Sequence, residues 1–125
     1  KKKNFDDCLM LDLNKNIAET SACNIFWIKN KKIFTSKEHS ILNGVTRQAV
    51  IKMCKKNNLK IFKGDYNLKH LISADSAFVT GTAAEIQPIG KILGKKYNVK
   101  CQIIKQLKNE YNKLKIECPK EVKKI

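Results

Sequence analysis

The stretch FVTGTAAEIQPIG, residues 78–90, decides how this chain is interpreted. Phe78-Val79 and Ile86 belong to two apolar runs typical of short strands, and Gly81 lies between the runs with a threonine on either side. A glycine at such a junction indicates either a tight corner of a sheet or a place where a ligand approaches the backbone. Taken alone, the stretch favours the packing explanation.

The segments before this stretch predict two hairpins and a helix. Residues 8–13 and 17–20 are strand candidates around Asn14 and Asn16, which tolerate the left-handed backbone of a tight turn. The apolar run 24–28 and residues 33–34 predict a second hairpin. We expect a loop over 35–43 and a helix over about 46–57, with Thr46 at its N-cap.

The remaining segments complete a mixed domain. We expect a strand at 59–64, a short helix over 67–75 capped by Asn67, and strands at 76–80 and 85–89. The tail predicts an amphipathic helix that Pro119 ends, with apolar residues at spacings of three or four: Val99, Ile103, Leu107, Tyr111 and Leu114. This order predicts an α/β fold with a mixed sheet or pseudo-barrel and flanking helices, as a single domain over residues 1–125.

Composition narrows the classes of function. A hydrophobic content of 42% excludes a disordered chain, and no apolar run approaches the roughly 18 residues of a membrane span. The net charge of +15 suggests an anionic partner, yet of 26 basic residues only Arg47 is an arginine, and the lysines are spread along the chain. We therefore interpret the charge as compositional, and expect neither a nucleic-acid nor a membrane partner.

Cysteine usage and the N-terminus indicate a cytoplasmic protein. The five cysteines are odd in number and lack metal-ligand spacing, which is typical of reduced intracellular thiols. Cys54 is expected as a small core residue, and His39 and His70 as surface residues. The chain begins at Lys1 without a signal peptide, which suggests that it was processed or begins inside a longer gene product.

Three places combine polar groups with the start of a helix or the end of a strand. Gly44 followed by Thr46 suggests an anion site at a helix start, although a threonine cap is the ordinary explanation. Gly81 with its flanking threonines suggests close approach to a ligand or a bulge. Glu19 and Asn24 interrupt apolar runs, where a solvated carboxylate is the simpler explanation.

Together these places resemble one known family. LDLNKNIAETSACNIFWIKNKKIFT (11–35), SILNGVTRQAVI (40–51) and ADSAFVTGTAAEIQPI (74–89) occur in the order and at the separations of the C-terminal half of class IV pyridoxal-phosphate aminotransferases. Within that class they are most similar to branched-chain amino acid aminotransferases. The resemblance is strongest over residues 8–93 and implies the large, C-terminal domain of the D-amino acid aminotransferase-like fold.

The resemblance implies a role for six residues around bound pyridoxal 5'-phosphate. Glu19 would hold the pyridine nitrogen protonated, which makes the ring a better electron sink. Val45, Thr46 and Thr82 would bind the phosphate, and Leu42 would lie under the ring. The backbone of Thr82 and Ala83 would meet the substrate carboxylate.

The family's cofactor-binding lysine and N-terminal domain are not found in this sequence. Only 18 residues precede Glu19, and Lys1, Lys2 and Lys3 lie too close to it, so we read them as solvated charge. Three alternatives stay open: the cofactor domain of an enzyme whose other half is a separate chain or was removed, a remnant without catalysis, or a basic binding protein on the same scaffold. We expect the chain alone to be inactive, and its partner to be an N-terminal half or a second copy of itself.

Overall fold

A five-stranded mixed sheet with the order β5-β4-β3-β6-β7 forms the centre of the computed structural model, which describes residues 7–38 and 41–117. Only β4 and β5 run parallel, and the other neighbours pair antiparallel. Two-stranded hairpins, β1-β2 and β8-β9, accompany the sheet. The elements are β1 Leu9–Leu11, β2 Ile17–Thr20, β3 Asn24–Lys29, β4 Lys32–Ser36, α1 Val45–Lys56, β5 Ile61–Gly64, α2 Leu68–Ile72, β6 Ser76–Gly81, β7 Glu85–Pro88, β8 Lys91–Ile92, β9 Lys95–Lys96 and α3 Gln102–Glu117.

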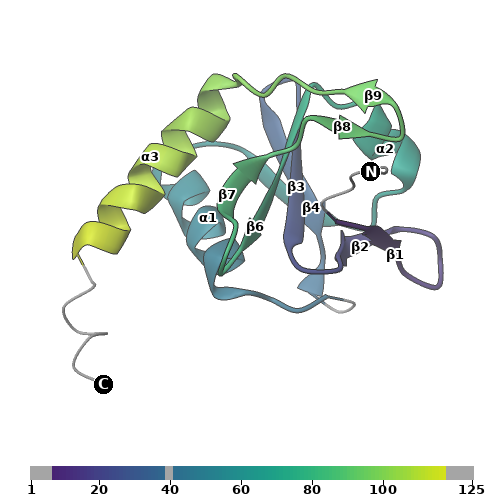
Figure 1. Ribbon diagram of the computed structural model, residues 1–125, viewed down its shortest axis with the longest axis horizontal. Coiled ribbons are helices and arrows are strands. Elements are labelled where there is room, and N and C mark those ends of the chain that lie inside the picture. Colours follow the sequence, from purple (N-terminus) through teal and green to yellow (C-terminus); the bar gives the residue numbers. More distant parts are fainter. Residues whose placement is uncertain (1–6, 39–40, 118–125) are drawn as a thin grey trace, which may run out of the picture.

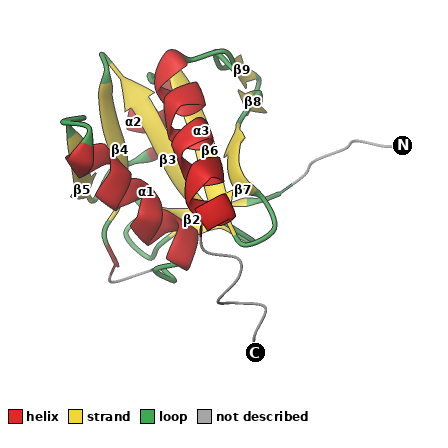
Figure 2. Ribbon diagram, turned by 90° about the vertical axis from the view of Figure 1, so that its left-hand side faces the viewer, coloured by secondary structure: helices red, strands yellow, loops and turns green. Residues whose placement is uncertain are grey.

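Both faces of the sheet are covered, which explains the continuous apolar run of β3. Helices α1 and α3 lie side by side on one face, and α2 lies toward the other face (Figures 1 and 2). Phe26 and Ile28 pack under α1 and α3 with Val50, Cys54 and Leu107, while the alternate residues of β3 point the other way. A second core on that opposite face contains Ile17, Ile25, Trp27, Leu71, Ala77 and Tyr97.

The expected fold class is confirmed, and so are both early hairpins, Asn67 as the cap of α2 and Cys54 as a core residue. The Asn67 side chain accepts from the backbone N–H of His70. Cys54 is fully buried, and burial, with a contribution from Glu110, raises its pKa to about 12. This thiol is a packing group.

Several expectations about local structure are wrong. The left-handed residue in the first turn is Lys15, with a φ of 65°, because Asp12 rather than an asparagine organises the turn through the amides of Asn14 and Asn16. Strand β4 extends through Ser36 into the expected loop, since its residues pair with β3 and β5. The β8-β9 hairpin was not expected, and α3 begins at Gln102, so Val99 lies outside it.

His70 is not the surface residue that we expected. Its Nδ1 accepts a hydrogen bond from Trp27 Nε1 at 2.8 Å, and its ring packs against Phe34 and Tyr66 with centroids 4.6 Å away in each case. Burial and the charge of Lys29 lower the pKa of His70. His39 lies outside the described residues.

Neither a membrane-spanning helix nor a cluster of metal-ligating side chains is found in the part of the chain that the structure describes. None of the helices there has the length and apolarity that a membrane crossing needs. The same residues contain no group of three His, Cys, Asp or Glu side chains that could hold a metal ion.

Candidate functional site

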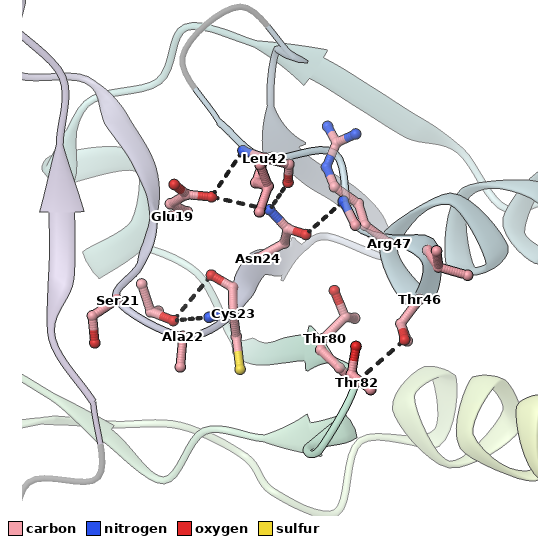
Figure 3. Close-up of a pocket in the computed structure, with 14 residues that line it drawn as sticks. Glu19, Ser21, Ala22, Cys23, Asn24, Leu42, Thr46, Arg47, Thr80 and Thr82 are labelled. Atoms are coloured by element: carbon pink, nitrogen blue, oxygen red, sulfur yellow. Dashed lines mark hydrogen bonds between the residues drawn. The ribbon is translucent and has the colours of Figure 1, made fainter.

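A cavity of about 180 Å³ lies where the chain connections at one end of the sheet meet the start of α1 (Figure 3). Three segments form its walls: the β2-β3 connection, residues 42–47, and the end of β6 with the turn that follows it. The lining residues are Glu19, Thr20, Ser21, Ala22, Cys23, Asn24, Leu42, Gly44, Val45, Thr46, Arg47, Thr80, Gly81 and Thr82. The cavity therefore joins the three places that the sequence singled out.

Glu19 occupies one side of the cavity and is held there by two donors. The backbone N–H of Leu42 donates to Glu19 Oε1 at 3.1 Å, and Asn24 Nδ2 lies 3.4 Å from the same oxygen. Asn24 Nδ2 also donates to the Leu42 carbonyl at 2.8 Å, and its Oδ1 accepts from the N–H of Gly44 at 3.3 Å. Asn24 thus fixes the carboxylate and the entry to α1 with one side chain.

The start of α1 lies on another side and presents backbone donors. Gly44 is the N-cap, with no side-chain cap hydrogen bond and no acidic residue in the first turn. The prediction of Thr46 as cap is therefore wrong: Thr46 is inside the helix, and its hydroxyl donates to the Gly81 carbonyl at 3.3 Å. Because Gln48 N–H is the first to bond back to Gly44 O, the amides of Val45, Thr46 and Arg47 have no intrahelical acceptor.

The third wall is β6 with its turn, where glycine allows close packing. A Cβ on Gly81 would lie 3.0 Å from Cys23 Sγ, and one on Gly44 would lie 3.0 Å from Asn24 Oδ1. Thr82 is exposed, whereas Thr80 is fully buried and its hydroxyl has no hydrogen-bond partner among the described residues. Thr82 is consequently the threonine of this pair that a ligand can reach.

Two further lining residues have structural roles. Burial and the nearby Asp7 carboxylate raise the pKa of the Cys23 thiol, which keeps it protonated. The guanidinium of Arg47 is turned away from Thr46 and is fully buried, where it donates to Ser36 O, to Asn43 Oδ1 and to Glu38 (Figure 3). Arg47 anchors the loop before α1 from inside.

Five of the six predicted site residues line the cavity. Glu19 lies on the side opposite Thr46 and Thr82 in Figure 3, and Leu42 and Val45, 78% and 81% exposed, stand at the rim. Ala83 is exposed and lies outside the lining. The sequence singled out Asn24 but gave it no role. It did not predict a structural role for Arg47, although the presence of a single arginine among 26 basic residues could have indicated one.

The cavity suits a ligand with two different ends. Uncapped amides at a helix start and the helix dipole bind an anion such as phosphate. A fixed carboxylate on the other side accepts from a cationic N–H group. The two glycines keep the walls close, so the cavity can present donors to an anionic group at one end and an acceptor to a cationic N–H group at the other.

Comparisons with known proteins point to one family. The family model for amino-transferase class IV matches residues 1–92. The "Probable branched-chain-amino-acid aminotransferase" of Rickettsia felis is 38% identical over 113 residues, which are 88% of this chain and 39% of that protein. The chain thus spans about two fifths or less of the length of the curated relatives it matches.

Solved structures give the same result. The branched-chain aminotransferase of Thermoproteus uzoniensis, solved with norvaline, superimposes with a TM-score of 0.81 at 31% identity, covering 86% of this chain and 36% of that one. The branched-chain amino acid aminotransferase of Escherichia coli gives a TM-score of 0.79 at 30% identity, with 84% of this chain and 37% of that one covered. On the family match and these likenesses, the chain belongs to the class IV aminotransferases.

Proposed function

We propose that residues 1–125 form the cofactor-binding, C-terminal domain of a branched-chain amino acid aminotransferase. Such an enzyme transfers an amino group between leucine, isoleucine or valine and 2-oxoglutarate. The observation that supports the proposal most is the pairing of Glu19 with the uncapped start of α1 on opposite sides of one cavity. Pyridoxal 5'-phosphate, when bound, supplies the electron sink for the loss of the substrate's α-proton.

Glu19 is proposed to hold a proton on the pyridine nitrogen. Its carboxylate is oriented by the Leu42 N–H and by Asn24, both of which donate to Oε1. Oε2 has no hydrogen bond of its own among the described contacts, so it is free to accept from a ring N–H. The exposed Leu42 side chain at the rim offers an apolar surface to the ring face.

The phosphate is proposed to lie at the start of α1. The amides of Val45 and Thr46 and the hydroxyls of Thr46 and Thr82 are its donors, and no carboxylate in the first turn opposes it. The substrate carboxylate is proposed to meet the backbone of Thr82 and Ala83. Ala83 lies outside the cavity lining, at the exposed turn, which supports a contact to substrate more than one to the cofactor.

The cavity encloses only part of a ligand. Its volume of about 180 Å³ is below the roughly 300–1,000 Å³ of ordinary small-molecule sites. We propose that sequence outside these 125 residues, or a second copy of the chain, covers the open side. The exposed apolar side chains of Leu42 and Val45 at the rim favour such a covering surface.

The chain by itself is proposed to be inactive in transamination. Among the residues that the structure describes, none that lines the cavity is a lysine, so these residues offer no amine to attach the cofactor or move the α-proton. Incubating the purified chain with pyridoxal phosphate, leucine and 2-oxoglutarate should produce no glutamate above a no-protein control. Measurable turnover would contradict this part of the proposal.

Cofactor binding is best tested with pyridoxamine 5'-phosphate, whose amine does not condense with the many surface lysines. We expect calorimetric titration to give saturable binding, and Thr46→Val and Thr82→Val each to weaken it by about tenfold or more, the effect of a hydrogen bond to a charged group. Thr35→Val is the matched control, because this threonine lies outside the cavity lining and its hydroxyl donates to Ile25 O inside the core. Equal affinity in all four chains would argue against the assigned phosphate site.

Glu19 is tested separately by Glu19→Gln. We expect the affinity for the phosphate ester to change little, because the phosphate end is intact. The absorbance of the bound ligand should change from the protonated to the unprotonated pyridine, since an amide does not stabilise the ring cation. An unchanged spectrum would remove Glu19 from the proposed role.

A further inference from the structure

Helix α3 reaches the candidate site from outside the segment that the family model matches, which ends at residue 92. The helix packs beside α1 and against β7 (Figure 2). Tyr111 lies in its middle, with its ring packed against the core under α1. The ring is therefore fixed by packing while its hydroxyl extends toward the start of α1.

The hydroxyl of Tyr111 meets the hydroxyl of Thr46, with the two oxygens 3.4 Å apart. Thr46 Oγ1 has one further partner, the Gly81 carbonyl at 3.3 Å, which can only accept. A threonine hydroxyl has a single proton, and here Thr46 donates it to the Gly81 carbonyl. In the contact between the two hydroxyls, Tyr111 is therefore the donor and Thr46 the acceptor. The result is a directed chain from Tyr111 through Thr46 to the β6 carbonyl.

A second contact from α3 reaches the turn that follows β6. Lys115 Nζ forms an ion pair with Glu85 Oε2, at the residue where the turn after β6 ends. The backbone of Glu85 has a φ of 60°, which is uncommon for a residue other than glycine. One helix thus contacts both the α1 start and the base of the turn that carries Thr82.

We propose that Tyr111 is a positioning residue for the phosphate site. This inference rests on the proposed function. A phosphate oxygen at the α1 start takes the place of the Gly81 carbonyl as acceptor for Thr46. Tyr111 then keeps donating to Thr46 Oγ1, which holds the threonine hydrogen toward the anion and strengthens it as a donor.

Removing only the Tyr111 hydroxyl tests this role. Tyr111→Phe keeps the packed ring, and we expect it to weaken pyridoxamine 5'-phosphate binding roughly three- to tenfold, the effect of one neutral hydrogen bond. Binding of pyridoxamine, which lacks the phosphate, should not change. Tyr66→Phe makes the same chemical change in the aromatic cluster around Trp27 and serves as the control.

A double-mutant cycle with Thr46→Val separates positioning from packing. If Tyr111 acts through Thr46, Tyr111→Phe has no further effect on affinity in the Thr46→Val chain. Additive losses in the cycle, or a wild-type affinity in Tyr111→Phe, would overturn the role of Tyr111 and leave the proposed function standing. Absence of binding by the wild-type chain would instead overturn the proposed function and, with it, this inference.

Discussion

Arg47 shows at the residue scale how one buried cation organises the approach to the site. It is fully buried and donates to Ser36 O and Asn43 Oδ1, on either side of residues 39–40. Lys63 contributes the largest of the effects that lower the pKa of Glu38 to about 2, and Arg47 adds to it. Arg47 thus links Asn43, just before α1, to the end of strand β4 and to the carboxylate of Glu38.

We expect Arg47→Met to lower the free energy of unfolding by about 2–4 kcal/mol, because buried acceptors lose their donor. Lys52→Ala, on the exposed part of the same helix, should change it by no more than about 0.5 kcal/mol. Urea unfolding of the two variants measures the difference. Equal stability of Arg47→Met and the wild type would show that Arg47 does not anchor the segment.

His70 gives a pH dependence at the same scale. Its pKa is lowered from the ordinary 6.5 by burial and by Lys29, so the folded chain favours neutral His70, which accepts from Trp27. This stability is complete above the unfolded pKa and is lost as the pH falls below about 6.5 toward the lower folded value. We expect the wild type to lose more stability than His70→Gln between about pH 7.5 and about pH 5.5.

The fluorescence of Trp27, the only tryptophan, reports this unfolding directly. The two chains are compared by their urea midpoints at both pH values. A parallel decline in both would mean that groups other than His70 account for the pH dependence.

At the element scale, the junction between β6 and the turn after it depends on Gly81. We expect Gly81→Ala to destabilise the chain by about 1–3 kcal/mol, because the added Cβ would lie 3.0 Å from Cys23 Sγ. Cys23→Ala removes that neighbour, so the double variant should recover most of the loss. Gly90→Ala is the control: its Cβ meets nothing within 4 Å, and its stability should be unchanged or higher. No recovery in the double variant would place the strain elsewhere.

Elements with local signals were predictable from the sequence, and those set by long-range contacts were not. Short apolar runs separated by turn residues predicted the first two hairpins, and Asn67 marked α2 correctly. The parallel pairing of β4 with β5 depends on α1 returning the chain across the sheet, which no local pattern shows. The short β8-β9 strands carry lysines rather than an apolar alternation, so they gave no strand signal.

The candidate site was predictable only in part, for the same reason. Glu19, Thr46 and Thr82 were found because they stand in recognisable blocks of sequence. Asn24 and Tyr111 act through partners far along the chain, such as Leu42 and Thr46, and those contacts exist only in the folded structure. The N-cap was misassigned because a glycine before a threonine leaves two candidates that only backbone geometry separates.

At the scale of the whole molecule, the two cores leave one end of the sheet for binding. Helices α1 and α3 hold the helix start and the turn after β6 from one face, and the β2-β3 connection brings Glu19 to the other side of the cavity. The net charge of +15 is carried by lysines along the whole length, so an anionic ligand has many alternative surface contacts. A decisive measurement must therefore locate the ligand as well as detect it.

The most direct measurement is the change in amide chemical shifts of the ¹⁵N-labelled chain on titration with pyridoxamine 5'-phosphate. The proposed function predicts the largest saturable changes at Val45, Thr46 and Thr82, with a second group at Glu19 and Leu42, and their loss in Thr46→Val. Changes spread over the lysine-bearing surfaces of α1 and α3, or no saturable change at the start of α1, would contradict the assignment of this cavity as a pyridoxal-phosphate site.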